Sequence, residues 1–348
     1  MCITFISFHN DTLLYSGNLT RSQSHPSLRM LNHMTTERIV LLGNSGSCAS
    51  ATEYKNVDIF TPEEADIEKA WEVCNCMNTT HGYFFIEAIA MKGEIYVFSG
   101  DDSKSAGTVE KFDYLSNQWS TCPSIPSKNM FISSAAINDS VIVSGGLSQQ
   151  TGAFSSSMYI MEMDDTKDGG ITWKNAGMLP AGRYGHASIF YEGKLWILGG
   201  QLEGEQQQSN SCLLYDPLSC QCADGPPSKM CRVWLKMFII NKKLYAVGGD
   251  NISPKSCPSI EVYDNKKECW KIVTFFPAPR KLYSSAVSGA KIYVFGGKDV
   301  HYCNVNTFDV YDVATDTWSC AIDGNLERQT IHNKEYFHGG QAVSISYA

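Results

Sequence analysis

The chain has 348 residues, of which 43% are hydrophobic and 18% charged, and this composition excludes a largely disordered protein. Its formal net charge of −8 at pH 7 argues against a nucleic-acid binder that depends on overall positive charge. The 13 cysteines are odd in number and scattered, and residues 1–8 lack the basic start of a signal peptide. We therefore expect reduced, mostly buried thiols in a cytoplasmic protein that does not bind membranes.

The chain begins with a polar segment that fits no repeat. Residues 1–35 are rich in Ser, Asn and His, so we expect a disordered tail there. The rest of the chain, residues 36–348, is expected to form one folded unit.

A strand-like run that ends in a glycine pair recurs from residue 37 onward. Residues 242–250 read KKLYAVGGD and residues 290–299 read AKIYVFGGKD. Glycine pairs allow a positive φ and close backbone approach where a strand must turn. The first residue of each pair, or its substitute, is Gly43, Ser99, Gly145, Gly199, Gly248 or Gly296. A feature that occurs six times indicates architecture rather than a single site.

An aromatic or apolar residue, usually followed by Asp, comes after each glycine pair and precedes a second recurring position. That position holds Trp71, Trp119, Trp173, Cys222, Trp270 and Trp318. Large rings at one repeat position are expected to fill the space between neighbouring units. The spacing predicts four short strands per unit: A before a turn, B ending in the glycines, C ending in the aromatic–Asp pair, and D carrying the Trp.

Taken together, the glycine pair, the segments TVEKFD, SIEVYD and NTFDVYD, and the following Trp resemble kelch repeats, which have a period near 50 residues. The resemblance is to the kelch domain of the BTB–BACK–Kelch (Kelch-like) proteins. It implies an all-β, six-bladed kelch β-propeller with four antiparallel strands per blade. We expect residues 340–347 to supply strand A of the first blade and so close the ring. A rival register takes residues 334–340 as a degenerate B strand.

The B–C and D–A loops of such a meander lie on one face, and the D–A loops carry a regular pattern. Ten residues after the Trp position stand His81, Asn129, Arg183, Arg232, Arg280 and Arg328, and nearby lie Tyr83, Phe131, Tyr184, Trp234 and Tyr283. Guanidinium groups bind carboxylates and aromatic rings supply rigid contact area, which suits an extended peptide, including an acidic one. The alternative is that these arginines hold the repeat together by bonding loop carbonyls or a framework carboxylate.

The resemblance implies a non-catalytic protein-interaction module that recognises a substrate protein for a cullin-RING ubiquitin ligase. An actin-binding or other cytoskeletal scaffold role is the alternative. The sequence has no phosphate loop, GxSxG or HExxH motif, so we expect no catalytic residue, cofactor or metal site. About 35 residues precede the first repeat, too few for a BTB region, so this chain is expected to reach a cullin only through a region it does not contain. A truncated sequence and a stand-alone kelch protein both remain open.

Overall fold

The structure is a computed structural model that describes residues 36–44, 56–62, 70–78, 86–99, 107–148, 150–164, 166, 170–205, 208–250, 258–305, 307–319 and 341–347. The tail expected at residues 1–35 lies outside the described residues. Regular structure within these ranges consists of strands. No helix among the described residues is long and apolar enough to cross a membrane.

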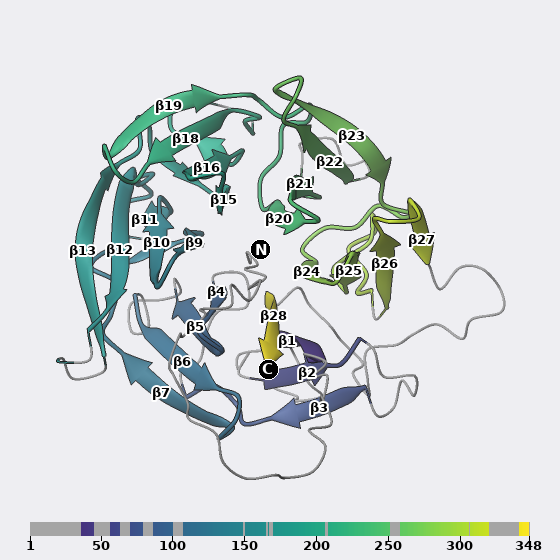
Figure 1. The fold of residues 1–348 in the computed structure, drawn as a ribbon, viewed down its shortest axis with the longest axis horizontal. Coiled ribbons are helices and arrows are strands. Elements are labelled where there is room, and N and C mark those ends of the chain that lie inside the picture. Colours follow the sequence, from purple (N-terminus) through teal and green to yellow (C-terminus); the bar gives the residue numbers. More distant parts are fainter. Residues whose placement is uncertain are drawn as a thin grey trace, which may run out of the picture.

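Six four-stranded antiparallel sheets stand around a central axis like the blades of a propeller (Figure 1). In blade order, the innermost strands are β28 (Gln341–Tyr347), β4 (Ile86–Met91), β9 (Ser133–Ile137), β15 (Ala187–Tyr191), β20 (Lys236–Ile240) and β24 (Ser284–Ser288). The second strands are β1 (Thr36–Asn44), β5 (Glu94–Ser99), β10 (Ser140–Ser144), β16 (Lys194–Leu198), β21 (Lys243–Val247) and β25 (Lys291–Phe295).

The two outer strands of each blade contain the remaining repeat positions. The third strands are β2 (Asn56–Phe60), β6 (Val109–Asp113), β12 (Ser157–Met163), β18 (Cys212–Asp216), β22 (Ser259–Asp264) and β26 (Phe308–Asp312). The outermost are β3 (Trp71–Cys74), β7 (Gln118–Cys122), β13 (Ile171–Met178), β19 (Gln221–Gly225), β23 (Cys269–Phe275) and β27 (Thr317–Ser319). The predicted A–B–C–D order of strands, the six blades and the all-β fold are confirmed.

The ring is closed between the two ends of the chain. Strand β28 pairs antiparallel with β1, from Thr36 opposite Tyr347 to Leu42 opposite Gln341. Blade 1 is thus built as β28-β1-β2-β3, with the C-terminal strand innermost (Figure 1). The closure predicted from residues 340–347 is confirmed, and it covers the inner edge of β1, which would otherwise be open.

The hydrophobic core is divided among the seams between blades. Each of six buried clusters draws its side chains from two neighbouring blades, and each contains the Trp position of one of them. The Trp270 indole N–H donates to Pro226 O at 3.0 Å, and Trp173 donates to Pro123 O at 2.9 Å, so these rings also tie a blade to the one before it. The expectation that this position belongs to the core is therefore met.

The nine described cysteines are free thiols. Only Cys74, Cys122 and Cys212 among them are buried, so the expectation of mostly buried thiols is wrong for the described residues. The others are exposed or half-buried, and among them Cys222 lies at a Trp position and packs against the seam between blades 3 and 4.

Candidate binding face

The loops that join B to C and D to A meet on one face of the ring, which we call the loop face. Two short ladders form on it. Strand β8 (Asn129–Met130) pairs with β11 (Leu147–Ser148), and β14 (Arg183–Tyr184) pairs with β17 (Gln201–Leu202). Each ladder joins a D–A loop to the B–C loop of the blade that it enters, so both kinds of loop form one surface.

The glycine pairs receive these loops from the neighbouring blade. The Gly146 N–H donates to Arg183 O at 2.8 Å, and the Gly200 N–H donates to Arg232 O at 2.9 Å. A Cβ built on Gly248 would stand 1.4 Å from the Tyr283 hydroxyl oxygen, and the φ of Gly248 is +65°. The pair is therefore required for the close approach of adjacent blades as well as for the turn.

The loop arginines are directed into their own blades. Arg183, Arg232 and Arg280 are only 2%, 2% and 5% exposed. Their Nη1 atoms donate to the carbonyl oxygen of the first glycine of the following pair: Gly199 at 3.3 Å, Gly248 at 2.6 Å and Gly296 at 3.3 Å. Asn129 makes the equivalent contact to Gly145 O at 3.4 Å. These contacts match the alternative in which the position holds the repeat together.

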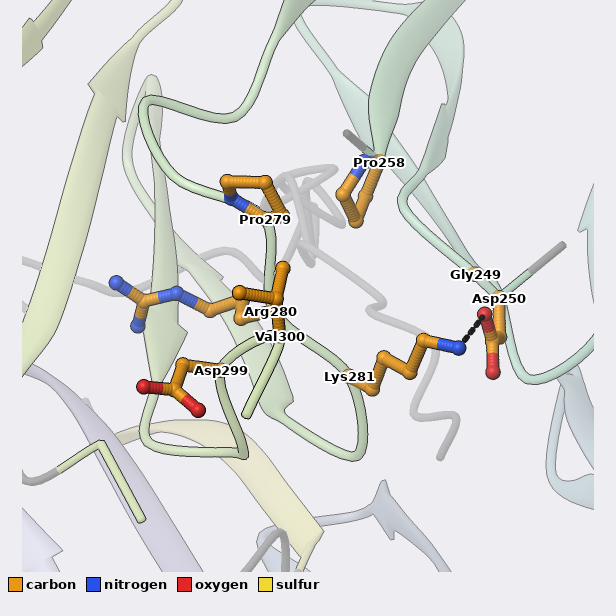
Figure 2. A pocket seen from close by; sticks show the side chains of 8 residues that line it. All are labelled: Gly249, Asp250, Pro258, Pro279, Arg280, Lys281, Asp299 and Val300. Carbon is orange, nitrogen blue, oxygen red and sulfur yellow. Dashed lines mark ion pairs between the residues drawn. The ribbon is translucent and has the colours of Figure 1, made fainter. Parts of the chain in front are cut away.

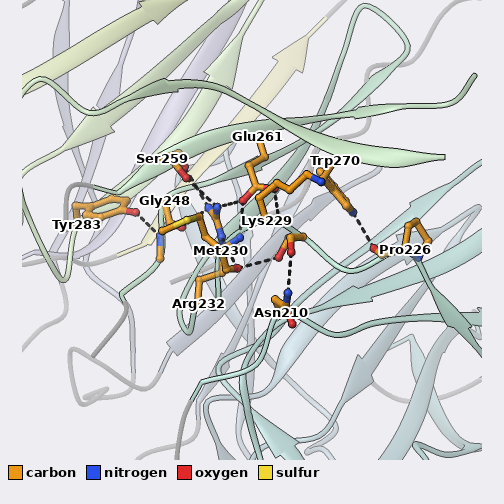
Figure 3. A network of polar contacts seen from close by, with 12 residues as sticks. Asn210, Pro226, Lys229, Met230, Arg232, Gly248, Ser259, Glu261, Trp270 and Tyr283 are labelled. Carbon is orange, nitrogen blue, oxygen red and sulfur yellow. Dashed lines mark hydrogen bonds and ion pairs between the residues drawn. The ribbon is translucent and has the colours of Figure 1, made fainter. Parts of the chain in front are cut away.

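In blades 5 and 6 the arginine also meets a buried carboxylate. Arg232 pairs with Glu261 and donates to Ser259 O at 3.1 Å, at the centre of the network in Figure 3. Arg280 pairs with Asp309. Burial raises the pKa of the Asp309 carboxyl, and Arg280 opposes that rise. Two of the three described loop arginines are thus neutralised by a carboxylate inside the fold.

Arg183 in blade 4 is in a different environment. The residue at the position of Glu261 is Leu213, because Leu213 faces Ile197 as Glu261 faces Ala246. Among the described residues Arg183 makes no ion pair, and burial lowers the pKa of its guanidinium. This guanidinium is directed into the blade like the other two but has no described carboxylate partner there.

Three aromatic residues predicted as contacts gather on the loop face. The ring centroids of Phe131 and Tyr184 are 5.6 Å apart, and those of Phe131 and Trp234 are 5.9 Å apart. Phe154, from the B–C loop of blade 3, lies 4.9 Å from Tyr184. All four side chains are partly exposed. We call these four residues the aromatic platform; Phe154 was not anticipated, since it occupies no repeat position.

The backbone under this platform is left-handed at one repeat position. Phe131, Gly185, Trp234 and Leu282 have φ of 57°, 63°, 58° and 56°. The Gly185 N–H donates to Phe131 O at 3.1 Å and the Trp234 N–H donates to Gly185 O at 2.6 Å, so a line of backbone hydrogen bonds crosses three neighbouring loops. Glycine adopts this conformation freely, whereas a bulky residue pays roughly 1–2 kcal/mol.

The other predicted contact residues divide into two groups. Tyr283 is 4% exposed, and its hydroxyl oxygen accepts the Gly249 N–H at 2.6 Å, which places it in the seam between blades 5 and 6. His81, Tyr83 and Arg328 lie outside the described residues.

A pocket opens beside these loops, between blades 5 and 6 (Figure 2). Pro258 and Pro279 line one side of it. Lys281 extends toward Asp250, and Lys281 Nζ lies 3.2 Å from Asp250 Oδ1. Asp250 is joined to the platform through its backbone, because Asp250 N donates to Val233 O at 2.7 Å.

The central axis is lined by polar groups from the innermost strands. Glu87 on β4 is 2% exposed, and its Oε1 accepts the Ser134 N–H at 3.1 Å and the Ser134 hydroxyl at 2.9 Å. Burial raises the pKa of Glu87 to about 7, and the positive charge of Lys236 opposes the rise. No group of three or more metal-ligating His, Cys, Asp or Glu side chains occurs among the described residues.

Six four-stranded blades, glycine pairs in four of them, tryptophans at five of the six seam positions and a C-terminal closing strand define a kelch-repeat β-propeller. Two family models match the chain: the KLHDC2/KLHL20/DRC7 Kelch-repeats domain over residues 185–330 and the Kelch motif over residues 85–126. The chain is thus a kelch-repeat propeller that resembles the kelch domain of Kelch-like proteins.

Curated relatives are similar over most of this chain. Kelch-like protein 25 of Xenopus tropicalis is 24% identical over 71% of the chain and 43% of its own length. Kelch-like protein 15 of Danio rerio is 23% identical over 75% of the chain and 46% of its own length. Beta-scruin of Limulus polyphemus is 23% identical over 80% of the chain and 31% of its own length. The chain therefore spans less than half the length of these relatives.

Proposed function

We propose that the chain is a non-catalytic protein-interaction module that binds its partner on the loop face, across the aromatic platform. The observation that carries this proposal is the left-handed backbone at Phe131 and Trp234. The equivalent residue in blade 4 is Gly185, where the lack of a side chain leaves room for Val233 and the Trp234 ring, and in blade 6 it is Leu282. Glycine would adopt this left-handed backbone at a lower free-energy cost than a large residue. The presence of large, partly exposed rings there therefore supports a role for them in contacting a partner.

The buried arginines change which residues are proposed as contacts. Arg183, Arg232 and Arg280 bond framework carbonyls, so we assign them to the scaffold. The expectation of an acidic peptide depended on exposed guanidinium groups and loses its basis here. Phe131, Phe154, Tyr184 and Trp234 are the contacts that we propose instead.

From the resemblance to Kelch-like proteins we propose that the partner is a substrate protein of a cullin-RING ubiquitin ligase. In this proposal the propeller recognises the substrate in the cytoplasm. A BTB region outside this sequence would contact the cullin. The similarity to a scruin as well as to Kelch-like proteins supports a second candidate, a cytoskeletal scaffold that binds actin.

A capture experiment tests both candidates. The purified chain is immobilised, and bound proteins are identified by mass spectrometry for the wild type, Trp234→Gly and Leu218→Ala. Leu218 is 98% exposed in the C–D turn of blade 4, on the opposite face, and serves as the control. We expect a substrate protein to be lost with Trp234→Gly and kept with Leu218→Ala. Filamentous actin without any ubiquitin-pathway protein would favour the scaffold, and equal capture by all three would contradict the loop-face assignment.

A further inference from the structure

The aromatic platform is flanked by carboxylates on the segments that pair with it. Tyr184 lies opposite Gln201 in the β14–β17 ladder, and Glu203 N donates to Gly182 O at 2.9 Å. Glu203 and Glu205, in the turn that follows this ladder, are both exposed. On the other side, Asp250 pairs with Val233 beside Trp234. Glu203 and Asp250 therefore border the rings through backbone hydrogen bonds, and Glu205 follows in the same turn as Glu203.

Four cations of the D–A loops are buried or paired, whereas Lys128 and Lys229 on the same loops are exposed. Arg232 and Arg280 are buried with Glu261 and Asp309, and Lys281 is paired with Asp250. Arg183 is 2% exposed and directed to Gly199 O, and it also interacts electrostatically with Glu205 without forming an ion pair. Glu203 and Glu205 make no ion pair among the described residues. The B–C loop of blade 4 therefore presents two exposed carboxylates beside Tyr184.

Aromatic faces and carboxylates together select for a cation. The face of an aromatic ring carries partial negative charge and attracts a guanidinium or ammonium group, with Trp the strongest acceptor. A carboxylate beside the ring can bond the same guanidinium through its N–H groups. The loop face offers the partly exposed rings of Phe131, Tyr184 and Trp234, and it offers Glu203 and Glu205 as acids.

We propose that the segment recognised on the loop face carries an arginine or lysine side chain that stacks on the aromatic platform and pairs with Glu203 or Glu205. This inference rests on the proposed function and specifies the chemistry of the partner at the same site. Considered from the sequence alone, the loop arginines suggest an acidic partner, whereas this inference gives the partner a positive charge. A net charge of −8 on the chain acts in the same direction, because it favours the approach of a basic partner.

The test is a selection of random dodecapeptides displayed on phage against the full chain. Enriched clones are measured against the wild type, Trp234→Gly, Glu203→Gln/Glu205→Gln and the control Leu218→Ala. We expect the clones to contain Arg or Lys, to bind the first two variants about tenfold more weakly, and to bind the control normally. A synthetic copy of a selected peptide, with its arginine replaced by neutral citrulline, is expected to lose about the same factor.

The outcomes separate this inference from the proposed function. Clones that need Trp234 but lack a basic residue, or that bind as well after the citrulline exchange, overturn the cationic partner and leave the loop face standing. Clones rich in Asp and Glu also overturn the cationic partner and leave the loop face standing. Clones indifferent to Trp234→Gly, or a selection that enriches nothing, contradict peptide binding at the platform itself.

Discussion

The arginine position has the same carbonyl partner in three blades but not the same carboxylate partner. Arg280 neutralises the buried Asp309, whereas Arg183 faces the blade in which Leu213 replaces the acid. Removing one partner of a buried ion pair is costly because the other charge is left without compensation. The same substitution should therefore have unequal effects at the two positions.

We expect Arg280→Leu to lower the free energy of unfolding by about 3–5 kcal/mol and Arg183→Leu to lower it by clearly less. Urea denaturation of the two variants measures the difference. The double variant Arg280→Leu/Asp309→Leu should recover much of the loss, since it leaves no buried carboxylate behind. Equal losses for the two single variants would show that the ion pair does not distinguish these blades.

The glycine positions allow the same kind of comparison. We expect Gly248→Ala to destabilise the chain far more than Gly193→Ala. Both glycines have positive φ, +65° and +78°, so both variants carry backbone strain of roughly 1 kcal/mol. Only the Cβ at Gly248 would collide with Tyr283, whereas nothing lies within 4 Å at Gly193. Thermal melts of the two variants decide this, and similar melting temperatures would contradict the role of the pair as a seam contact.

At the scale of the element, the blades could be predicted because their signals repeat. Glycine pairs, aromatic–Asp pairs and tryptophans recur at nearly constant spacing, which gives the four-strand unit. The closing strand β28 follows because the first unit has no strand A and one strand remains after the last Trp. Residue type alone does not decide whether the loop arginines point to a partner or into the blade. Each of Arg183, Arg232 and Arg280 nevertheless precedes the first glycine of a pair by 16 residues. That constant spacing to a framework position is the signal that favours the scaffold role.

The aromatic platform could be predicted only in part. Phe131, Tyr184 and Trp234 belong to a repeated loop, so their presence on one face follows from topology. Their mutual contact does not, because it depends on a left-handed backbone at Phe131 and Trp234 that no sequence rule assigns to a bulky residue. Phe154 joins them from an irregular B–C loop, where no repeat fixes its position.

At the scale of the whole molecule, the innermost strands bring Glu87, Ser134 and Lys236 from three different blades to the central axis. Burial raises the pKa of Glu87 from 4.5 to about 7. Between these values the folded chain binds more protons than the unfolded chain, so stability falls as the pH rises through that window. Below pH 4.5 the carboxyl is protonated in both states, and the destabilisation is absent.

We expect Glu87→Gln to remove this dependence. The wild type should lose on the order of 1–3 kcal/mol of unfolding free energy between pH 4.5 and 7.5 relative to the variant. Urea denaturation of both proteins at a series of pH values measures the difference in slope. Parallel profiles would mean that Glu87 is ionised in the folded ring throughout this range.

The central claim is that the loop face separates its tasks: arginines hold the blades and the aromatic platform binds the partner. The most direct measurement combines the unfolding free energy with partner capture for Phe131→Gly/Trp234→Gly and for Arg280→Leu. We predict that the aromatic variant loses capture while its unfolding free energy stays within about 2 kcal/mol of the wild type, because relief of backbone strain offsets part of the lost packing. Arg280→Leu should instead lose stability and, under conditions where it remains folded, still capture the partner. Retained capture by the aromatic variant, or lost capture by a folded Arg280→Leu chain, would contradict the claim.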